Sequence, residues 1–243
     1  MLSWLRTVFF TGPLVVLLTT FYGTVDLIVS FIDSSGDWQH GVARMWSRTL
    51  LLMGGVRISL SGIENIHPNG SYVFAANHLS LSDTPVVLAN IPCQFRFMAK
   101  NSLFNVPFIG FHLRRGGHIP VPREDTRAAV RAVLDAGRII RQRNISVLQF
   151  PEGSRSNGEL RPFKEGAAMI AIAAGVPIVP VAIEGTRAVM PPGSLLMSPG
   201  DVRIRIGKPI PTEGLTSRER KALTLQVREQ VEALLAEIHK NTV

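Results

Sequence analysis

Residues 72–83 read Tyr-Val-Phe-Ala-Ala-Asn-His-Leu-Ser-Leu-Ser-Asp, an apolar run that passes directly into a polar loop. The apolar part, residues 72–76, predicts a buried β-strand. A helix is predicted over residues 83–89, so the stretch forms one strand–loop–helix unit. Such units are typical of α/β domains, in which ligands collect at the strand ends. The loop places His78 five positions before Asp83.

His78 and Asp83 are a candidate base and its orienting carboxylate. A neutral imidazole accepts a hydroxyl proton near neutral pH when a carboxylate holds its other ring nitrogen in the required tautomer. Nothing in the sequence resembles the Gly-x-Ser-x-Gly turn that supplies a protein nucleophile. We therefore expect the attacking hydroxyl to belong to the substrate. The alternative is a loop histidine followed by a helix-starting aspartate, which is the common explanation of an isolated His-x4-Asp spacing.

Strands and helices alternate on both sides of this stretch, which predicts an α/β domain. Strands are predicted at 56–60, 72–76, 95–99, 118–121, 146–150, 176–183 and 202–206, and helices at 37–53, 83–89, 126–141, 163–174 and 217–240. Asp125 is a predicted helix cap, and Thr216 with Glu219 forms a capping-box pattern. Prolines punctuate the strand at 176–183, which predicts irregular or edge pairing there.

The N-terminal segment predicts a membrane anchor over residues 1–36, followed by one folded domain over 37–243. No charged residue lies between Arg6 and Asp26, and the apolar run approaches the roughly 20 residues that cross a bilayer. A signal peptide is disfavoured because the apolar part is too long and lacks a small-x-small cleavage site. A spanning helix and shorter, half-embedded helices both stay open, because the run is interrupted by Gly12-Pro13, Gly23 and Asp26.

The residues after the anchor predict its orientation. Three arginines follow the anchor: Arg44, Arg48 and Arg57. Because positive residues stay on the cytoplasmic side of a membrane, they place the bulk of the chain on that side. The predicted helix at 37–53 carries aromatic and apolar residues at helical spacing. These side chains have two explanations of equal weight, contact with the lipid headgroups and packing in the core.

The composition predicts an anionic partner. The 243 residues include 26 Lys+Arg against 18 Asp+Glu, a net charge of +8, which suits nucleic acid, an anionic membrane or a phosphorylated small molecule. Aromatic content of 7% and arginines that gather beside the polar loops argue against nucleic acid. The single Cys93 excludes an internal disulfide and indicates a reducing compartment. No sequence pattern for metal or nucleoside-triphosphate binding is present.

Two further stretches suit an anion. Residues 150–158 read Phe-Pro-Glu-Gly-Ser-Arg-Ser-Asn-Gly, in which the backbone of Gly153 and Ser154 can approach a phosphate and Arg155 can grip two oxygens. Residues 114–123 place three arginines around a glycine pair and a short strand, and Lys100 ends another strand. An ordinary turn and a solvated basic face are the alternatives for these stretches.

Together these segments resemble the glycerolipid acyltransferases, and most closely the 1-acylglycerol-3-phosphate acyltransferases. The family motif Asn-His-x-Ser-x-x-Asp is matched at 77–83, and Phe-Pro-Glu-Gly-Thr/Ser-Arg-Ser is matched at 150–156. A third motif appears at 117–123, with Pro120 where an aromatic residue is usual, and the proline-punctuated strand matches the fourth. The resemblance covers about residues 55–210. It implies a single mixed-sheet α/β domain with flanking helices behind the N-terminal anchor.

The resemblance also implies an activity: transfer of an acyl chain from acyl-CoA or acyl carrier protein to the free hydroxyl of a lysophosphatidic acid at a membrane. The product is phosphatidic acid, an intermediate of phospholipid biosynthesis. His78 is then the general base and Asp83 orients it. No metal, cofactor or covalent acyl-enzyme is expected. The residues implied to bind the substrate, with Glu152 shaping the loop or bonding an acceptor hydroxyl, are Lys100, Arg123, Glu152, Gly153, Ser154 and Arg155.

Two rival functions stay open. In the first, the chain is still an acyltransferase, but its acceptor is a different lysolipid, such as a lyso-ornithine lipid, or glycerol 3-phosphate. In the other class, the chain is a non-catalytic basic protein that binds membrane surfaces or nucleic acid. Several polar residues are expected to be structural: Ser82 as a helix cap, Cys93 as an inert thiol, and His40, His67, His112, His118 and His239 as packing or surface residues without a partner apparent in the sequence.

Overall fold

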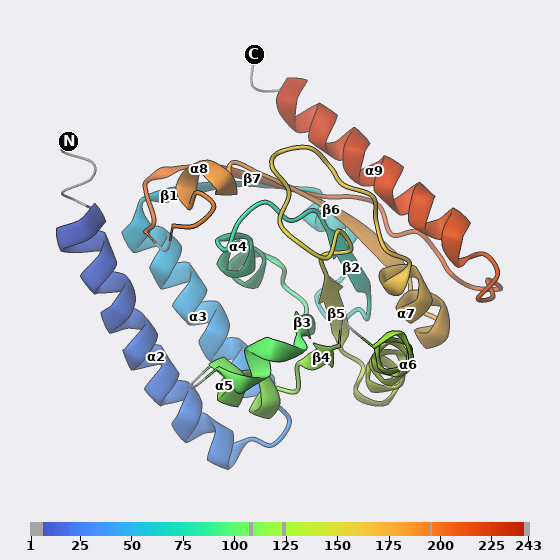
Figure 1. Ribbon diagram of the computed structural model, residues 1–243, viewed down its shortest axis with the longest axis horizontal. Coiled ribbons are helices and arrows are strands. Elements are labelled where there is room, and N and C mark those ends of the chain that lie inside the picture. The colour runs from blue at the N-terminus through green and yellow to red at the C-terminus, as the bar shows by residue number, and fades with distance from the viewer. Residues whose placement is uncertain (1–6, 107–108, 123–124, 195, 241–243) are drawn as a thin grey trace.

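The computed structural model describes residues 7–106, 109–122, 125–194 and 196–240. Within these ranges the chain forms one sheet of seven strands in the order β1-β7-β6-β2-β5-β3-β4 (Figure 1). Strands β6, β2, β5, β3 and β4 are parallel, β7 is antiparallel to β6, and β1 is parallel to β7. The predicted mixed sheet is confirmed. The strands are β1 Val56–Ser61, β2 Val73–Ala76, β3 Phe95–Lys100, β4 Ile119–Val121, β5 Ser146–Gln149, β6 Ile178–Glu184 and β7 Gly200–Ile206.

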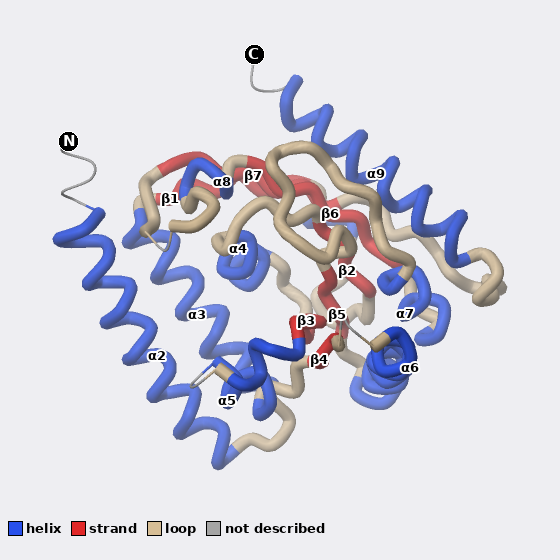
Figure 2. The backbone as a smooth tube through the Cα atoms, in the orientation of Figure 1, coloured by secondary structure: helices blue, strands red, loops and turns tan. Residues whose placement is uncertain are grey.

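Helices cover both faces of the sheet (Figure 2). Helices α3 and α4 pack on one face, α6, α7 and α9 pack on the other, and α2 lies outside α3. The α-helices are α2 Gly12–Ile32, α3 Asp37–Gly54, α4 Asp83–Asn90, α5 Ile109–Arg115, α6 Thr126–Arg143, α7 Gly166–Ala174, α8 Thr186–Val189 and α9 Arg220–Lys240. A π-helical turn occupies Thr7–Thr11, and 3₁₀ turns occupy Ile63–Asn65 and Asn101–Asn105.

Strand β2 is apolar at every position because both of its sides are covered. Phe74 and Ala76 point into the core beneath α3 and α4, whereas Val73 and Ala75 point into the core beneath α6 and α7. All four side chains are fully buried. A central strand with both faces covered therefore needs a continuous apolar run rather than an alternating one.

Strand β6 is central, so the predicted edge pairing is wrong. It pairs in parallel with β2 and antiparallel with β7. Pro177 precedes the strand, and Pro180 lies one residue beyond the end of the β6–β7 ladder at the Val181–Ile206 pair. The Pro180 carbonyl still accepts from Gly207 N at 2.8 Å. Pro180 has no N–H to donate, but it lies just beyond the end of the β6–β7 ladder. A proline at this position is therefore compatible with a central strand.

The N-terminal helix is continuous from Gly12 to Ile32, so neither Gly23 nor Asp26 breaks it into shorter helices. Gln39 and His112 both bond Oδ2 of the buried Asp26 carboxylate, which reduces the cost of its burial, whereas Oδ1 has no partner among the described residues. Residues Phe9–Ile32 are long and apolar enough to cross a membrane, and most of their side chains face away from the protein. The predicted anchor boundary at residue 36 falls in the loop between α2 and α3.

The other boundaries differ by a few residues. The predicted helix at 37–53 is α3, in which Val42 and Leu50 are buried whereas Trp38 and Met53 are exposed, so the helix has both a core side and an outer side. Helix α7 begins at Gly166 and α9 at Arg220, each three residues later than predicted. In front of α9, Thr216 donates through its backbone and hydroxyl to the Glu219 carboxylate, which forms a turn that is not yet helical. Helices α5 and α8 were not predicted.

Candidate active site

The loop between β2 and α4 brings His78 and Asp83 into contact. His78 Nδ1 lies 2.7 Å from Asp83 Oδ2. The same oxygen accepts from the backbone N–H groups of Leu79, at 2.7 Å, and Ser80, at 2.9 Å. The Asp83 side chain is fully buried, whereas the His78 side chain is 19% exposed. The aspartate therefore fixes the imidazole and leaves Nε2 as the ring nitrogen available to a substrate.

The loop after β5 holds His78 from the other side. Glu152 Oε1 accepts from the backbone N–H of His78 at 2.6 Å, and its Oε2 accepts from Arg161 N at 3.0 Å. Ser156 N donates to the His78 carbonyl at 2.8 Å, and the Phe150 ring stacks on the imidazole at 4.2 Å between centroids. Burial raises the pKa of Glu152, and the two backbone donors oppose that rise. Glu152 thus joins the two loops through Oε1 and holds its own loop together through Oε2.

Contacts with β6 and with the segment that follows it fix the position of the His78 loop. Asn77 makes two hydrogen bonds to the backbone of Ile183, at 2.9 and 2.7 Å. The Ser80 hydroxyl donates to the Met190 carbonyl at 2.6 Å. All three strands that carry these loops run in parallel, so their carboxyl ends meet at one edge of the sheet.

Ser82 does not cap α4, so that prediction is wrong. It occupies the position before the helix, but its hydroxyl donates to the Thr186 carbonyl at 3.0 Å and makes no cap hydrogen bond. The turn just before Thr186 requires Gly185, because its φ is +90° and a Cβ there would lie 2.1 Å from the Asp201 carbonyl oxygen on β7. A glycine directly after a buried strand was the sequence signal for this turn.

The loop at residues 150–158 carries more positive charge than the sequence patterns indicated. Arg155 is exposed and makes no hydrogen bond or ion pair within the described ranges. The Ser154 hydroxyl accepts from Arg161. Gly153 has a φ of +75°, and Lys164 Nζ lies 3.1 Å from the position that a Cβ would occupy there.

A further arginine comes from α8. Arg187 Nη1 donates to the Ser156 carbonyl at 3.3 Å, and the N–H of Ser156 donates to the His78 carbonyl. Three cations that sequence reasoning missed therefore surround this loop: Arg161, Lys164 and Arg187. Their nearness depends on contacts between β5, the loop and α8, which no local pattern reveals.

Of the two remaining predicted binding residues, Lys100 and Arg123, the structure describes only Lys100. Lys100 is exposed at the carboxyl end of β3, the second strand across from β2, about 10 Å away at ordinary strand spacing. Lys100 shares this edge of the sheet with His78, but among the described residues no hydrogen bond or ion pair joins its side chain to His78 or Asp83. Arg123 lies outside the described residues.

The remaining histidines differ in their surroundings. His118 is buried and its Nδ1 accepts from Phe97 N, so packing explains it. His112 is not without a partner, since its Nδ1 lies 3.0 Å from Asp26 Oδ2 across 86 positions of sequence. Burial also raises the pKa of the Cys93 thiol to about 11, which makes it inert. Within the described ranges no group of three or more His, Cys, Asp or Glu residues is placed to hold a metal ion.

Comparisons with known proteins agree with this geometry. A family model described as Acyltransferase matches residues 57–184. The chain is 34% identical over 176 residues to a chloroplastic 1-acyl-sn-glycerol-3-phosphate acyltransferase of Brassica napus, covering 71% of this chain and 50% of that protein. A 1-acyl-sn-glycerol-3-phosphate acyltransferase of Borreliella burgdorferi is 31% identical, with 74% and 72% covered. The chain thus spans about half the length of its plant relative.

A solved structure matches nearly the whole chain. The 1-acyl-sn-glycerophosphate (LPA) acyltransferase PlsC from Thermotoga maritima superposes with a TM-score of 0.77 and 28% identity. The match covers 96% of this chain and 98% of that chain. The likeness therefore includes the helices outside the matched motif region.

Proposed function

Because the chain belongs to the acyltransferase family that includes the 1-acyl-sn-glycerol-3-phosphate acyltransferases, we propose that it acylates lysophosphatidic acid. The acyl group comes from the thioester of acyl-CoA or acyl carrier protein, and the product is phosphatidic acid, an intermediate of phospholipid biosynthesis. The observation that carries this proposal is the 2.7 Å contact between His78 Nδ1 and Asp83 Oδ2, which leaves Nε2 for the acceptor hydroxyl.

The proposed reaction needs one proton carrier. His78 Nε2 takes the proton of the acceptor hydroxyl as its oxygen attacks the thioester carbonyl carbon. The tetrahedral intermediate then collapses, the carbon–sulfur bond breaks, and the thiolate takes the proton from the imidazolium. A thiol has a pKa near 8.5, so the thiolate leaves without a strong acid. Asp83 stabilises the imidazolium, and base catalysis of this kind contributes about 10² to 10⁴ in rate.

The acceptor phosphate is proposed to bind beside this pair, on the loop at residues 150–158. Arg155 is free to grip two phosphate oxygens, and Gly153 and Ser154 bring the backbone close. Arg161, Lys164 and Arg187 add positive potential around the same loop. Holding the phosphate fixes the neighbouring hydroxyl at His78, and such orientation is worth up to about 7–11 kcal/mol.

The proposed substrate is a lipid, and the exposed side of α2 supports its delivery from a membrane. Phe21, Ile28 and Phe31 are each more than half exposed on this helix. We propose that α2 attaches the protein to the membrane and that the sheet lies on the cytoplasmic side, where arginines follow the anchor. Lys100 at the end of β3 is proposed as an additional phosphate contact, and a role for Arg123 stays a prediction.

The acceptor is tested by product analysis. The purified protein is given one acyl donor and, in separate reactions, lysophosphatidic acid, a lyso-ornithine lipid or glycerol 3-phosphate. Mass spectrometry is expected to detect phosphatidic acid and little product from the other two. Arg155→Ala should raise the KM for lysophosphatidic acid, whereas Arg218→Ala, an exposed arginine next to α9, should not. Turnover of the phosphate-free lyso-ornithine lipid alone contradicts the proposed acceptor.

A further inference from the structure

Helix α6 carries a line of arginines that the proposed reaction does not use. The helix contains five arginines and one aspartate. Four of the arginines recur at helical spacing along its exposed side and are here termed the α6 stripe: Arg127, Arg131, Arg138 and Arg141. At 1.5 Å per residue the stripe is about 21 Å long. Within the described ranges, the guanidinium groups of Arg127 and Arg131 make no hydrogen bond or ion pair; Arg127 donates only through its backbone, to the Asp125 cap.

Exposed apolar side chains accompany the stripe. Val130 is 41% and Leu134 is 51% exposed on the same helix. Arginines interleaved with exposed aliphatic side chains are typical of protein interfaces, in which apolar anchors are surrounded by charged groups.

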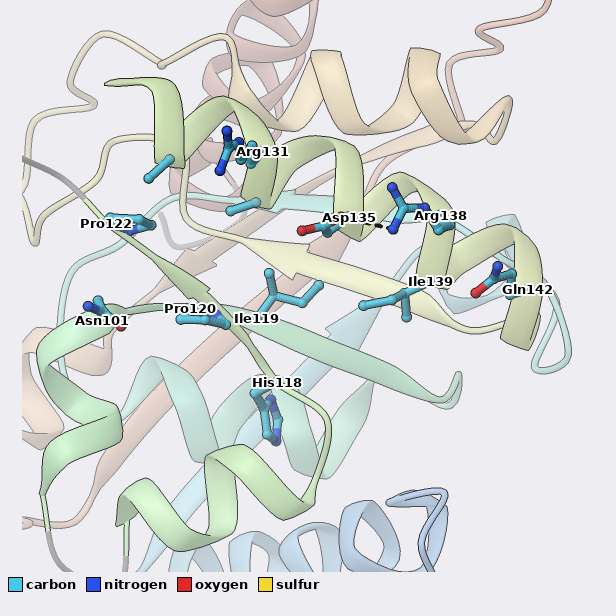
Figure 3. Close-up of a pocket in the computed structure, with 12 residues that line it drawn as sticks. Asn101, His118, Ile119, Pro120, Pro122, Arg131, Asp135, Arg138, Ile139 and Gln142 are labelled. Atoms are coloured by element: carbon cyan, nitrogen blue, oxygen red, sulfur yellow. Dashed lines mark ion pairs between the residues drawn. The ribbon is translucent and has the colours of Figure 1, made fainter. Parts of the chain in front are cut away.

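A groove of about 560 Å³ runs between α6 and β4 beneath the stripe (Figure 3). Ile119, Pro120 and Ile139 form its apolar floor, and Arg131 and Arg138 lie on its rim. β4 ends the sheet, so no further strand covers this side of it. The α6 stripe therefore borders a hollow in which an apolar side chain of a partner can sit.

The position of the stripe relates it to the proposed active site. Helix α6 follows β4, and β4 ends at the same edge of the sheet as the His78 loop. β4 is the third strand across from β2, about 14 Å away at ordinary strand spacing. A partner seated on α6 therefore has its end beside the edge at which acyl transfer is proposed.

We propose that the α6 stripe docks an acidic protein that carries the acyl donor as a thioester. The inference rests on the proposed function and selects one of its two donors. Opposite charges steer and orient such a partner, and Val130 and Leu134 give it apolar contacts. Docking on α6 delivers the flexible arm that holds the acyl group to the edge where His78 Nε2 is exposed.

Two other anionic partners fit the stripe less well. Coenzyme A carries its phosphates at one end of the molecule, so it engages one or two arginines rather than a line of four. A membrane in contact with α2 meets the opposite side of the sheet, because α3 and the sheet separate α2 from α6 (Figure 1). Among the described residues, the hydrogen bond between α6 and the loop that follows α2 comes from the last turn of α6, where Arg143 donates to the Ser35 carbonyl.

The test compares two donors that carry the same acyl chain, one on an acidic acyl carrier protein and one on CoA. The variant is Arg127→Glu/Arg131→Glu in the full-length chain, with lysophosphatidic acid as acceptor. Its matched control is Arg218→Glu/Lys221→Glu, which changes the net charge equally at two exposed residues outside α6. A second variant, Arg127→Lys/Arg131→Lys, keeps the charge.

The α6 stripe variant is expected to raise the KM for the carrier-protein donor at least tenfold and to leave kcat unchanged. Its KM for acyl-CoA should stay within twofold. The control and the lysine variant should behave like the parent protein, and added salt should raise the parent's KM for the carrier protein.

Four results overturn the inference. Two of them concern the KM of the α6 stripe variant, which is either unchanged for the carrier-protein donor or raised equally for both donors. The third is a loss of binding to anionic vesicles that accounts for the whole rise in KM. The fourth is a parent protein that uses acyl-CoA alone. The last result leaves the proposed function intact. A parent protein that uses neither donor contradicts the proposed function itself.

Discussion

Asp83 uses a single carboxylate oxygen three times, for His78 and for the backbone of Leu79 and Ser80. The loop therefore folds around the Asp83 carboxylate, and this conformation accounts for the five positions between His78 and Asp83. The sequence predicted the His78–Asp83 contact because both residues belong to one short loop. It did not predict the bonds of Ser80 and Ser82 to backbone about 100 positions later, because those partners are brought near only by the sheet.

Glu152 positions His78 rather than touching the reacting atoms. Replacing it with glutamine leaves one acceptor and turns an NH₂ group towards the second backbone N–H donor, so one of its two bonds is lost. We expect Glu152→Gln to lower kcat by about tenfold or more. The free energy of unfolding should change by only about 1 kcal/mol, because relief of the buried charge offsets the lost bond. Steady-state kinetics and denaturant unfolding measure the two effects.

Glu159→Gln is the control for this substitution. Glu159 is an exposed glutamate in the same loop, and we expect its replacement to leave kcat and stability unchanged. A Glu152→Gln enzyme with the full kcat would show that the joined loops are not needed to aim the imidazole.

His40 makes stability depend on pH. Burial, followed by the nearby Arg44 and Arg96, lowers its pKa to about 3, and neither ring nitrogen has a partner among the described residues. Between pH 6.5 and 3 the unfolded chain binds a proton at this residue that the folded chain does not. Its contribution to stability is therefore lost as the pH falls through this window.

The consequence is a test with His40→Phe, which keeps an aromatic ring against Phe95. From pH 8 to pH 5 we expect the variant to gain about 2 kcal/mol in unfolding free energy relative to the parent. Denaturant unfolding at both pH values measures this difference. A pH-independent effect of His40→Phe would refute the account.

Helix α3 is joined to the sheet by a buried arginine. The Arg96 side chain on β3 is fully buried, and its Nη2 lies 2.6 Å from Asp37 Oδ1 in the first turn of α3. Asp37→Ala leaves that guanidinium without its carboxylate. We expect a loss of about 2–3 kcal/mol in unfolding free energy, less than for a fully buried pair because Asp37 is half exposed.

The control breaks an exposed pair instead. Asp201→Ala removes the partner of Arg57 at 2.6 Å, but both side chains are more than half exposed. We expect a much smaller loss than for Asp37→Ala, because water screens an exposed ion pair. If both substitutions cost the same, burial of Arg96 does not fasten α3 to the sheet.

The elements themselves could largely be predicted, but their order in the sheet could not. Apolar runs and helical spacing identified β2, α3, α6 and α9, because a covered strand and an amphipathic helix leave local patterns. The central place of β6 and the short helix α8 depend on pairing between distant segments. Proline in β6 misled the prediction because its missing N–H lies beyond the end of β7.

At the scale of the whole molecule, α2 gives the protein an apolar outer side. We expect Phe21→Asp, at an exposed position of that helix, to weaken binding to anionic lipid vesicles. A charge in the hydrocarbon region costs about 2.5–3.5 kcal/mol, which corresponds to a large fall in the bound fraction. Co-sedimentation measures it.

Leu225→Asp is the matched control for the vesicle experiment. Leu225 is 52% exposed on α9, on the other side of the sheet, and its replacement should leave the bound fraction unchanged. Equal effects of the two substitutions would show that α2 is not the membrane contact.

The most direct test of the proposed chemistry is the rate at which His78→Ala forms phosphatidic acid from lysophosphatidic acid and an acyl thioester, measured by mass spectrometry. We predict a fall of about 10² to 10⁴ in a protein that still folds, because the backbone N–H and carbonyl of His78 hold their bonds to Glu152 and Ser156 without the ring. A folded His78→Ala protein that forms phosphatidic acid at the parent rate would contradict the account.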